Sequence, residues 1–413
     1  MASDLSGRFL DRATPPHIFT LILLAAIGAM NMAIFLPSLP AMAVYFDTSY
    51  EIIQLAVSLY LLVTGVLQLV IGPLADHFGR RPVMLWSLVI FIASTLGCLF
   101  APNIEIFMAC RMIQAAVATG MVLSRAVVRD MYPTNEAASM IGYVTGAMAL
   151  VPMIAPMIGG AIEVGFGWRG SFWVLAISGV LVLAVTWKDM GETNPGSGAS
   201  FRNQLRDTPE LFRSQRFWGY VFAAAFASGS FFAFLGGAPF VATEVYGLSA
   251  FWAGVGFGAP ATGYMIGSLM SGRFAARAGV NRMVLTGTLI TATGNGVGTI
   301  LHLLGHGSAY VFFLACTTIG LGNGLVVPNA SAGMLSVRPH LAGTASGVGS
   351  AAMIGGGSLL SMLAGVVLTN GGGALSLLTL MLTTSLLANV AILFVIRRTA
   401  FMGDDPSSEA RSR

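Results

Sequence analysis

Charge is what this sequence lacks most. Only 9% of its 413 residues are Asp, Glu, Lys or Arg, whereas 55% are hydrophobic. Soluble domains carry about 25% charged residues, so this composition excludes an ordinary soluble protein. The mean hydropathy is +0.80, and uncharged runs recur at about the 20 residues that an α-helix needs to cross a bilayer. The sequence therefore predicts an integral membrane protein.

Cysteine and histidine are also scarce, with three and five residues. The cysteines lie in or near apolar runs without metal-ligand spacing, so we expect Cys98, Cys110 and Cys316 to be buried free thiols. His302 and His306 are four residues apart, but no third ligand is near and neighbouring glycines indicate a loop. We therefore expect no metal and no cofactor. A membrane-embedded enzyme would need a cluster of such groups at one depth, which the sequence does not offer.

The net charge of +4 and the pI of 9.1 do not predict a nucleic-acid partner. Of the Lys and Arg residues, only Arg111 falls inside an apolar run and only Arg169 on the expected outer face. The others lie in the tails, in alternate loops and in a central linker. This asymmetry is the orientation bias of an inner-membrane protein and predicts that both termini are cytoplasmic.

Twelve apolar runs are long enough to span the membrane. We place them at 17–37, 52–72, 83–101, 104–125, 139–164, 170–187, 217–238, 250–271, 283–304, 308–328, 344–368 and 374–396. The segment 188–216 is rich in Gly, Ser, Asn and Pro and reads as a cytoplasmic linker. The expected parts are thus an N-terminal tail (1–16), two six-helix bundles (17–187 and 217–396) and a C-terminal tail (397–413). An all-α fold of two pseudo-symmetric bundles around a central cavity is typical of secondary transporters.

A short polar stretch occurs twice, 200 residues apart. Gly72–Leu85 reads GPLADHFGRRPVML and Gly272–Leu285 reads GRFAARAGVNRMVL. We interpret each as a turn between two spans at equivalent places in the two halves. In the first copy, Gly72 and Gly79 are expected to allow close approach or positive φ, and Pro73 and Pro82 to mark helix ends.

This stretch resembles the signature of the major facilitator superfamily, whose positions are occupied by Gly72, Leu74, Asp76, Gly79, Arg80 and Arg81. Further segments are similar to proton-coupled drug exporters of the Bcr/CflA (bicyclomycin and chloramphenicol) type: Leu36–Pro40, Arg111–Gln114, Val128–Pro133 and Pro328–Ser331. The resemblance implies a 12-helix multidrug exporter of the bacterial inner membrane. It would act as an antiporter of a small-molecule substrate and protons by alternating access, and we expect a monomer in the lipid bilayer.

Arg111 is the strongest candidate for substrate or proton coupling. A charge inside a span costs several kcal/mol unless it is paired or faces water, so we expect it to face the cavity, with Gln114 on the same helix face. Amides in a bilayer need partners, and aromatic side chains suit an adaptable pocket. The substrate and coupling candidates are Arg111, Gln114, Asn31, Phe35, Tyr60, Tyr264, Asn323 and Asn329.

Two further groups of residues are expected to govern the conformational change. A charge network at the inner mouth would form when that side closes, and Asp76 could cap the start of the eleventh span. The gating candidates are Gly72, Asp76, Gly79, Arg80, Arg81, Arg125, Arg129 and Asp130. The fifth span resembles the antiporter motif of exporters, in which a kink and close packing come from Pro152, Pro156, Gly159 and Gly160.

No carboxylate lies in the middle of any span. Where relatives carry an acidic residue, four positions before Pro37, this chain has Ala33. Proton exchange then requires that Glu51 or Glu105 reaches the outer cavity, or that Arg111 and the substrate's charge handle coupling, or that coupling is lost. A neutral or anionic substrate fits the cavity better than an organic cation, because only Arg111 supplies charge there.

Other functions remain as alternatives. A transporter of a single anionic or neutral metabolite would use Arg111 as a substrate ligand. A membrane receptor would need a signalling domain, and the longest soluble segment, 188–216, is too short for one.

Overall fold

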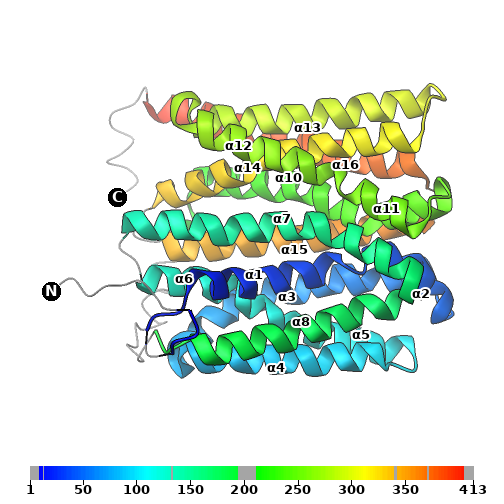
Figure 1. Cartoon of the computed structure of the whole chain (residues 1–413). Helices are drawn as coiled ribbons and strands as arrows, with labels where there is room; N and C mark the ends of the chain where they lie inside the picture. The colour runs from blue at the N-terminus through cyan, green and yellow to red at the C-terminus, as the bar shows by residue number, and fades with distance from the viewer. Residues whose placement is uncertain are drawn as a thin grey trace. The chain divides into compact units, whose positions relative to one another are not determined.

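The computed structural model describes residues 9–12, 14–131, 134–193, 211–338, 342–369 and 372–403, and its regular elements are all helices (Figure 1). Helix contacts divide the chain into two compact units: Met1–Phe201 with Ala238–Gly258, and Arg202–Gly237 with Ala259–Arg413. The expected all-α membrane fold is confirmed. Among the described residues, ten helical segments are long and apolar enough to cross a membrane, and Ile154–Phe166 is a shorter apolar one.

The elements before the central linker are α1 (Ile18–Ala33), the 3-10 helix η1 (Leu36–Ser38), α2 (Leu39–Tyr45), α3 (Tyr50–Phe78), α4 (Arg80–Leu99), α5 (Ile104–Ile113), the 3-10 helix η2 (Gln114–Val117), α6 (Ala118–Met131), α7 (Thr134–Phe166) and α8 (Trp168–Asp189). Those after it are α10 (Gln215–Phe240), the π-helix η3 (Val241–Val245), α11 (Ala250–Phe257), α12 (Ala259–Ala278), α13 (Val280–Leu303), α14 (Ala309–Val337), α15 (Ala342–Thr369) and α16 (Ala374–Gly403).

The turn between the second and third spans is much shorter than predicted. Helix α3 continues through Pro73 to Phe78, and only Gly79 separates it from α4. The prediction that Pro73 ends the helix is therefore wrong, because one missing backbone donor does not stop a membrane helix whose neighbours can compensate. Gly72 has neither positive φ nor a neighbour within 4 Å of an added Cβ, so its predicted role is also wrong.

The repeated stretch is preserved in the backbone. Gly79 has φ 90° and ψ 152° before α4, and Gly279 has φ 82° and ψ 152° before α13. Both torsion pairs lie in a region that strongly favours glycine. Two helix junctions of the same geometry thus occur 200 residues apart, as the sequence repeat predicted.

Three predicted spans are interrupted. The first ends as an α-helix at Ala33 and continues through η1 and α2, the fourth contains η2, and the eighth is divided at Gly258. Pro37 and Pro40 explain the first interruption, because proline cannot donate a backbone hydrogen bond. Irregular backbone at membrane depth is tolerated where other protein groups satisfy its hydrogen bonds. The residues that surround these breaks must therefore supply such groups.

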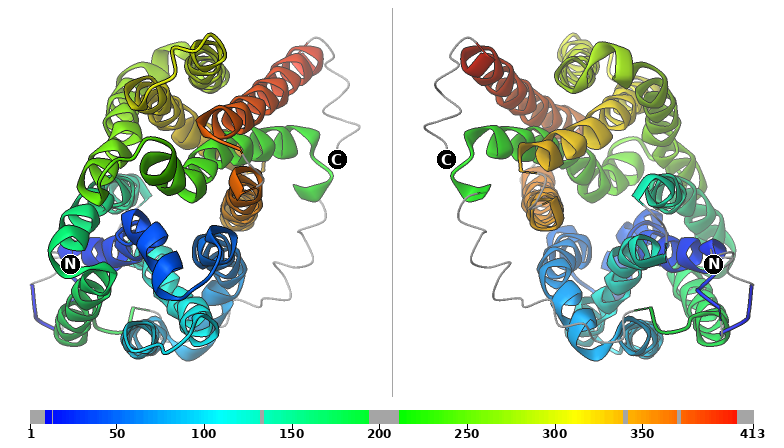
Figure 2. Two further views of the ribbon diagram at one scale, coloured as in Figure 1. Left: turned by 90° about the vertical axis from the view of Figure 1, so that its right-hand side faces the viewer. Right: turned by 90° about the vertical axis from the view of Figure 1, so that its left-hand side faces the viewer.

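Helices pack side by side within each unit (Figure 2), and glycine allows the closest of these contacts. In the first unit, an added Cβ at Gly159 of α7 would lie 1.7 Å from the Ile34 carbonyl oxygen, and one at Gly160 would lie 2.3 Å from that of Ala250. In the second unit, a Cβ at Gly320 of α14 would lie 1.5 Å from the Pro260 carbonyl oxygen. Bare backbones in contact are the usual way that membrane helices pack.

Candidate functional site

The Arg111 side chain is entirely buried, with 0% of its surface exposed. Its Nε donates to the Ala56 carbonyl oxygen at 3.2 Å, and Nη2 donates to the Asn31 carbonyl oxygen at 3.0 Å. Its Nη1 donates to Asn31 Oδ1 at 2.9 Å and to Gln114 Oε1 at 2.5 Å. Four of the five guanidinium hydrogens therefore have acceptors, and all of these acceptors are uncharged.

Two aromatic rings cover the faces of the guanidinium. The Arg111 Cζ atom lies 4.3 Å from the centroid of Phe35 and 4.2 Å from that of Tyr60. Desolvated cation–π contacts contribute on the order of 2 kcal/mol each. Together with four charge-assisted hydrogen bonds, they offset the cost of burying a charge whose partners among the described residues include no carboxylate.

The interruption of the first span supplies one of the acceptors. Because α1 ends at Ala33, Asn31 is among the last residues of the helix, whose carbonyl groups lack partners inside it. The Asn31 carbonyl oxygen accepts from Arg111 instead. A second change of helix geometry, η2, begins at Gln114, directly after the helix that carries Arg111. Both breaks thus lie at the guanidinium.

A chain of hydrogen bonds extends the site to a fourth helix. Gln114 Nε2 donates to Thr95 Oγ1 at 2.7 Å, and Thr95 Oγ1 donates to the Phe91 carbonyl oxygen at 2.6 Å. Asn31 Nδ2 is buried and has no partner within the described part of the chain. The Arg111 cluster, defined as Asn31, Phe35, Tyr60, Arg111 and Gln114, therefore joins α1, α3, α4 and α5 and keeps one unused amide donor.

These five residues were all predicted as substrate or coupling residues, and the structure brings them together. The other three predicted substrate or coupling residues, Tyr264, Asn323 and Asn329, lie in the second unit. Asn329 Nδ2 donates to Ser271 Oγ at 2.7 Å, whereas the buried Asn323 Oδ1 has no partner among the described residues. The Tyr264 carbonyl oxygen lies 2.5 Å from a Cβ added at Gly324. Asn323, Asn329 and Tyr264 are positioned by α14 and α12.

Two of the gating candidates, Arg80 and Asp130, form an ion pair. Arg80 Nε donates to Asp130 Oδ2 at 2.5 Å, joining the start of α4 to α6, and the Arg80 side chain is 7% exposed. Arg81 Nε donates to the Met190 carbonyl oxygen at 2.7 Å. Arg125 Nε donates within its own helix, to the Met121 carbonyl oxygen at 3.3 Å. The side chains of Asp76 and Arg129 lie outside the described set.

The antiporter-motif residues lie within one continuous helix. Pro152 and Pro156 are inside α7. Gly159 packs on α1 and Gly160 on α11, and a Cβ at Gly254 of α11 would lie 2.6 Å from the Pro156 carbonyl oxygen. The expected close packing therefore occurs on two sides of α7.

Sequence reasoning missed two acidic residues directly after the sixth span. Glu192 accepts from the backbone N–H groups of Arg80 and Arg81, at 2.9 and 3.1 Å, and so caps the free start of α4. Asp189 is 0% exposed and accepts from the N–H groups of Leu10 at 2.6 Å and His17 at 2.9 Å. The sequence did show two carboxylates at the end of an apolar run, but these resembled solvated charges of the linker. Their role as hydrogen-bond acceptors could not be predicted while the start of α4 was placed too late in the chain.

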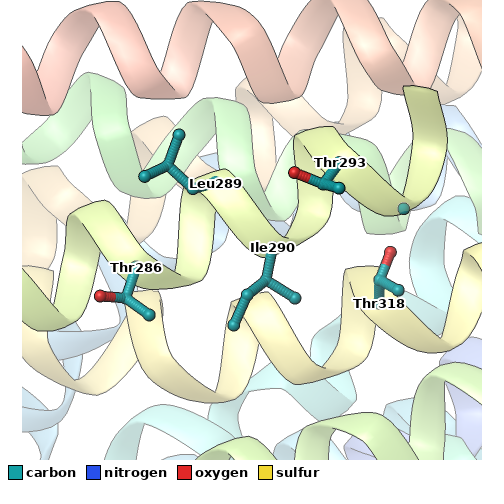
Figure 3. A pocket seen from close by; sticks show the side chains of 6 residues that line it. Thr286, Leu289, Ile290, Thr293 and Thr318 are labelled. Carbon is teal, nitrogen blue, oxygen red and sulfur yellow. The ribbon is translucent and has the colours of Figure 1, made fainter. Parts of the chain in front are cut away.

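A groove of about 420 Å³ lies in the second unit, between α13 and α14, and is lined by Thr286, Leu289, Ile290, Thr293, Gly294 and Thr318 (Figure 3). None of the predicted site residues lines it. It is open along one side and lined mainly by apolar atoms, which does not suit the binding of a polar substrate.

The interrupted apolar helices and the buried guanidinium among them define a polytopic membrane protein of the transporter class. The sequence model of the Major Facilitator Superfamily matches residues 21–362, and the chain belongs to this family.

Named relatives agree with this assignment. The chain is 30% identical to the "Uncharacterized MFS-type transporter YdgK" of Bacillus subtilis, over 84% of this chain and 88% of that protein. It is 28% identical to the "Chloramphenicol resistance protein" of Pseudomonas aeruginosa, over 84% and 82%. It is 27% identical to "Multidrug resistance protein D" of Escherichia coli, over 84% and 88%. Among solved structures, the D-xylose-proton symporter has a TM-score of 0.71 at 15% identity, covering 92% and 96%, which supports the fold.

Proposed function

We propose that this transporter exports small, largely apolar compounds, such as amphenicols or bicyclomycin-like drugs, across a bacterial inner membrane by proton antiport. Its two bundles, 17–187 and 217–396, would alternate between inward-open and outward-open arrangements, with both termini in the cytoplasm. The relatives named for chloramphenicol, bicyclomycin and multidrug resistance support the substrate class. The charge asymmetry of the loops supports the orientation.

The Arg111 cluster is the observation that carries the proposal. A wholly buried charge with neutral partners is costly, and this one lies where two spans lose their α-helical geometry. A costly ionisable residue inside a membrane span indicates a functional site. Discontinuous helices at membrane depth commonly form the substrate and coupling sites of transporters. The cluster would therefore be the part of the first bundle that responds to substrate or to a proton.

The geometry does not favour Arg111 as a direct ligand for a substrate carboxylate. Protein acceptors occupy four of its five donors, and rings cover both of its faces. A bidentate carboxylate would need two free parallel N–H groups. We therefore prefer the multidrug exporter to a transporter of a single anionic metabolite.

Arginine stays protonated in proteins, so another group must carry the proton. Among the described carboxylates at span ends, Glu105 is exposed, while Glu51 and Glu163 are partly buried. One carboxylate oxygen of Glu163 is buried, on the turn of α7 that follows the antiporter motif. We therefore place Glu163 first as the proton carrier.

Drug susceptibility in a host without its own efflux pumps tests the proposal. Expression of the wild-type chain should raise the inhibitory concentration of chloramphenicol, and an uncoupler of the proton gradient should remove this effect. Arg111→Lys should abolish resistance. Arg213→Gln, which alters an exposed arginine ahead of α10, is the matched control and should retain it. Resistance that survives the uncoupler would refute proton antiport.

A further inference from the structure

The described part of the second unit has arginines but no acidic residue. Between Leu211 and Gly403 the only acidic residue is Glu244, which belongs to the segment assigned to the first unit. Arg273 and Arg277 near the end of α12 and Arg282 at the start of α13 are exposed. No ion pair with a described residue involves any of them.

The corresponding arginines of the first unit are used differently. Arg80 is paired with Asp130, and Arg81 donates to backbone carbonyl groups at the end of α8, those of Trp187 and Met190. The repeated junction around Gly279 therefore presents positive charge that no described acidic residue compensates. Such charge attracts an anionic partner from outside the protein.

The groove on α13 and α14 begins one helical turn from Arg282. Its first lining residue, Thr286, shares a helix face with Arg282 and donates from Oγ1 to the Arg282 carbonyl oxygen at 2.8 Å. A second hollow, which extends to Leu301, shares Gly294 and Thr318 with the first. Because they share these residues, the two hollows form one groove along α13.

The groove is apolar despite its threonines. Thr286 and Thr318 both direct their hydroxyl hydrogens to carbonyl groups of their own helices, so they leave mainly methyl groups to line the space. The rim is also apolar, and Leu289, Val297 and Leu314 are 50%, 51% and 72% exposed. At 1.5 Å per residue, the groove is about 22 Å long from Thr286 to Leu301. This length exceeds the roughly 15 Å depth of one leaflet of hydrocarbon, so the groove is long enough for a lipid acyl chain.

We propose that this surface is a binding site for an anionic phospholipid. One acyl chain lies in the α13–α14 groove, and the headgroup phosphate binds Arg282, with Arg273 and Arg277 adding positive potential across the Gly279 junction. Basic pockets at the ends of membrane helices recognise lipid headgroups in this way. The leaflet is the one that faces the start of α13, which the proposed topology makes cytoplasmic.

Two other occupants fit less well. A second copy of the chain docked through the same surface would place these arginines against their own counterparts, because a two-fold interface repeats the same patch. A diffusible substrate would need an enclosed site, whereas this groove is open to the bilayer.

The test measures lipid retained by the purified protein. The chain is incubated with equal amounts of phosphatidylglycerol and phosphatidylethanolamine in detergent, washed, and analysed by mass spectrometry. Phosphatidylglycerol should be retained preferentially. Arg282→Gln should lower its retention about fivefold, the effect of one cationic side chain at a membrane surface. Thr293→Phe, which fills the groove from an exposed position, should lower retention of both lipids.

Lys188→Gln is the matched control, because Lys188 is an exposed cation at the end of α8 in the other unit, and it should leave retention unchanged. All variants must elute like the wild type on size exclusion. Equal retention of the two lipids, or retention unaffected by Arg282→Gln and Thr293→Phe, would overturn the proposal. Disulfide cross-linking of two Thr293→Cys copies in membranes would also overturn it and assign the groove to a second copy.

Discussion

Replacing Arg111 with lysine tests whether the planar guanidinium is required or only its charge. The wild-type side chain makes four hydrogen bonds from a rigid fork and lies between two rings. An ammonium group has three donors, so at least one of the four acceptor positions is lost, and it cannot lie flat between Phe35 and Tyr60.

The expected loss of stability follows from these contacts. A buried acceptor left without a donor costs about 1–3 kcal/mol, and weakened cation–π contacts cost on the order of 1 kcal/mol more. We expect Arg111→Lys to be less stable by about 2–4 kcal/mol, which corresponds to a decrease in Tm of about 4–16 °C for a unit of this size. Arg111→Ala orphans all of the acceptors at once and should be less stable still.

Thermal unfolding in detergent and chloramphenicol export from proteoliposomes measure the two consequences. Arg111→Lys should lose export at a temperature where it is still folded, because the cluster no longer fixes the geometry of the first span where α1 ends. The exposed Arg213→Gln control should match the wild type in both assays. If Arg111→Lys had wild-type Tm and full export, the positive charge alone would suffice and the geometric reasoning would be refuted.

Three further variants probe the remaining parts of the first unit. Asp130→Asn removes the carboxylate that accepts from Arg80 Nε and should reduce export severalfold, and the exchanged pair Arg80→Asp with Asp130→Arg should recover part of it in the same assay. Glu192→Ala removes the cap of α4 and should lower unfolding free energy by about 1–2 kcal/mol, seen as a lower Tm; an unchanged Tm would contradict the cap. Glu163→Gln should stop proton movement during drug exchange, followed with a pH-sensitive dye in proteoliposomes, while passive drug equilibration continues; undiminished proton movement would exclude Glu163 as the carrier.

The Arg111 cluster shows how much of a site can be predicted from sequence. Arg111 and Gln114 share a helix face by their spacing, and Asn31, Phe35 and Tyr60 were predicted from their residue types, an amide that needs a partner and aromatic side chains that suit a pocket. The sequence could not predict that the Asn31 carbonyl oxygen becomes an acceptor, because that depends on the α-helix ending at Ala33. Pro37 indicated a change near this point but not which carbonyl would be freed.

The helix cap at α4 was missed for a different reason. Hydropathy indicates where a span can lie, but polar residues of the signature stretch continue the helix to Phe78, and α4 begins at Arg80. Only with that boundary does Glu192, more than 100 residues later, become a partner for free N–H groups. Contacts between a backbone and a distant side chain leave no periodic pattern in the sequence.

Asp189 has a consequence for how the beginning of this chain can vary. It recognises main-chain N–H groups at Leu10 and His17 rather than their side chains. Most substitutions at these two positions would therefore preserve this attachment to Asp189, although the His17 side chain also caps the start of α1. Proline is the exception, because it has no hydrogen to offer, and a proline at either position would detach the N-terminal segment from α8.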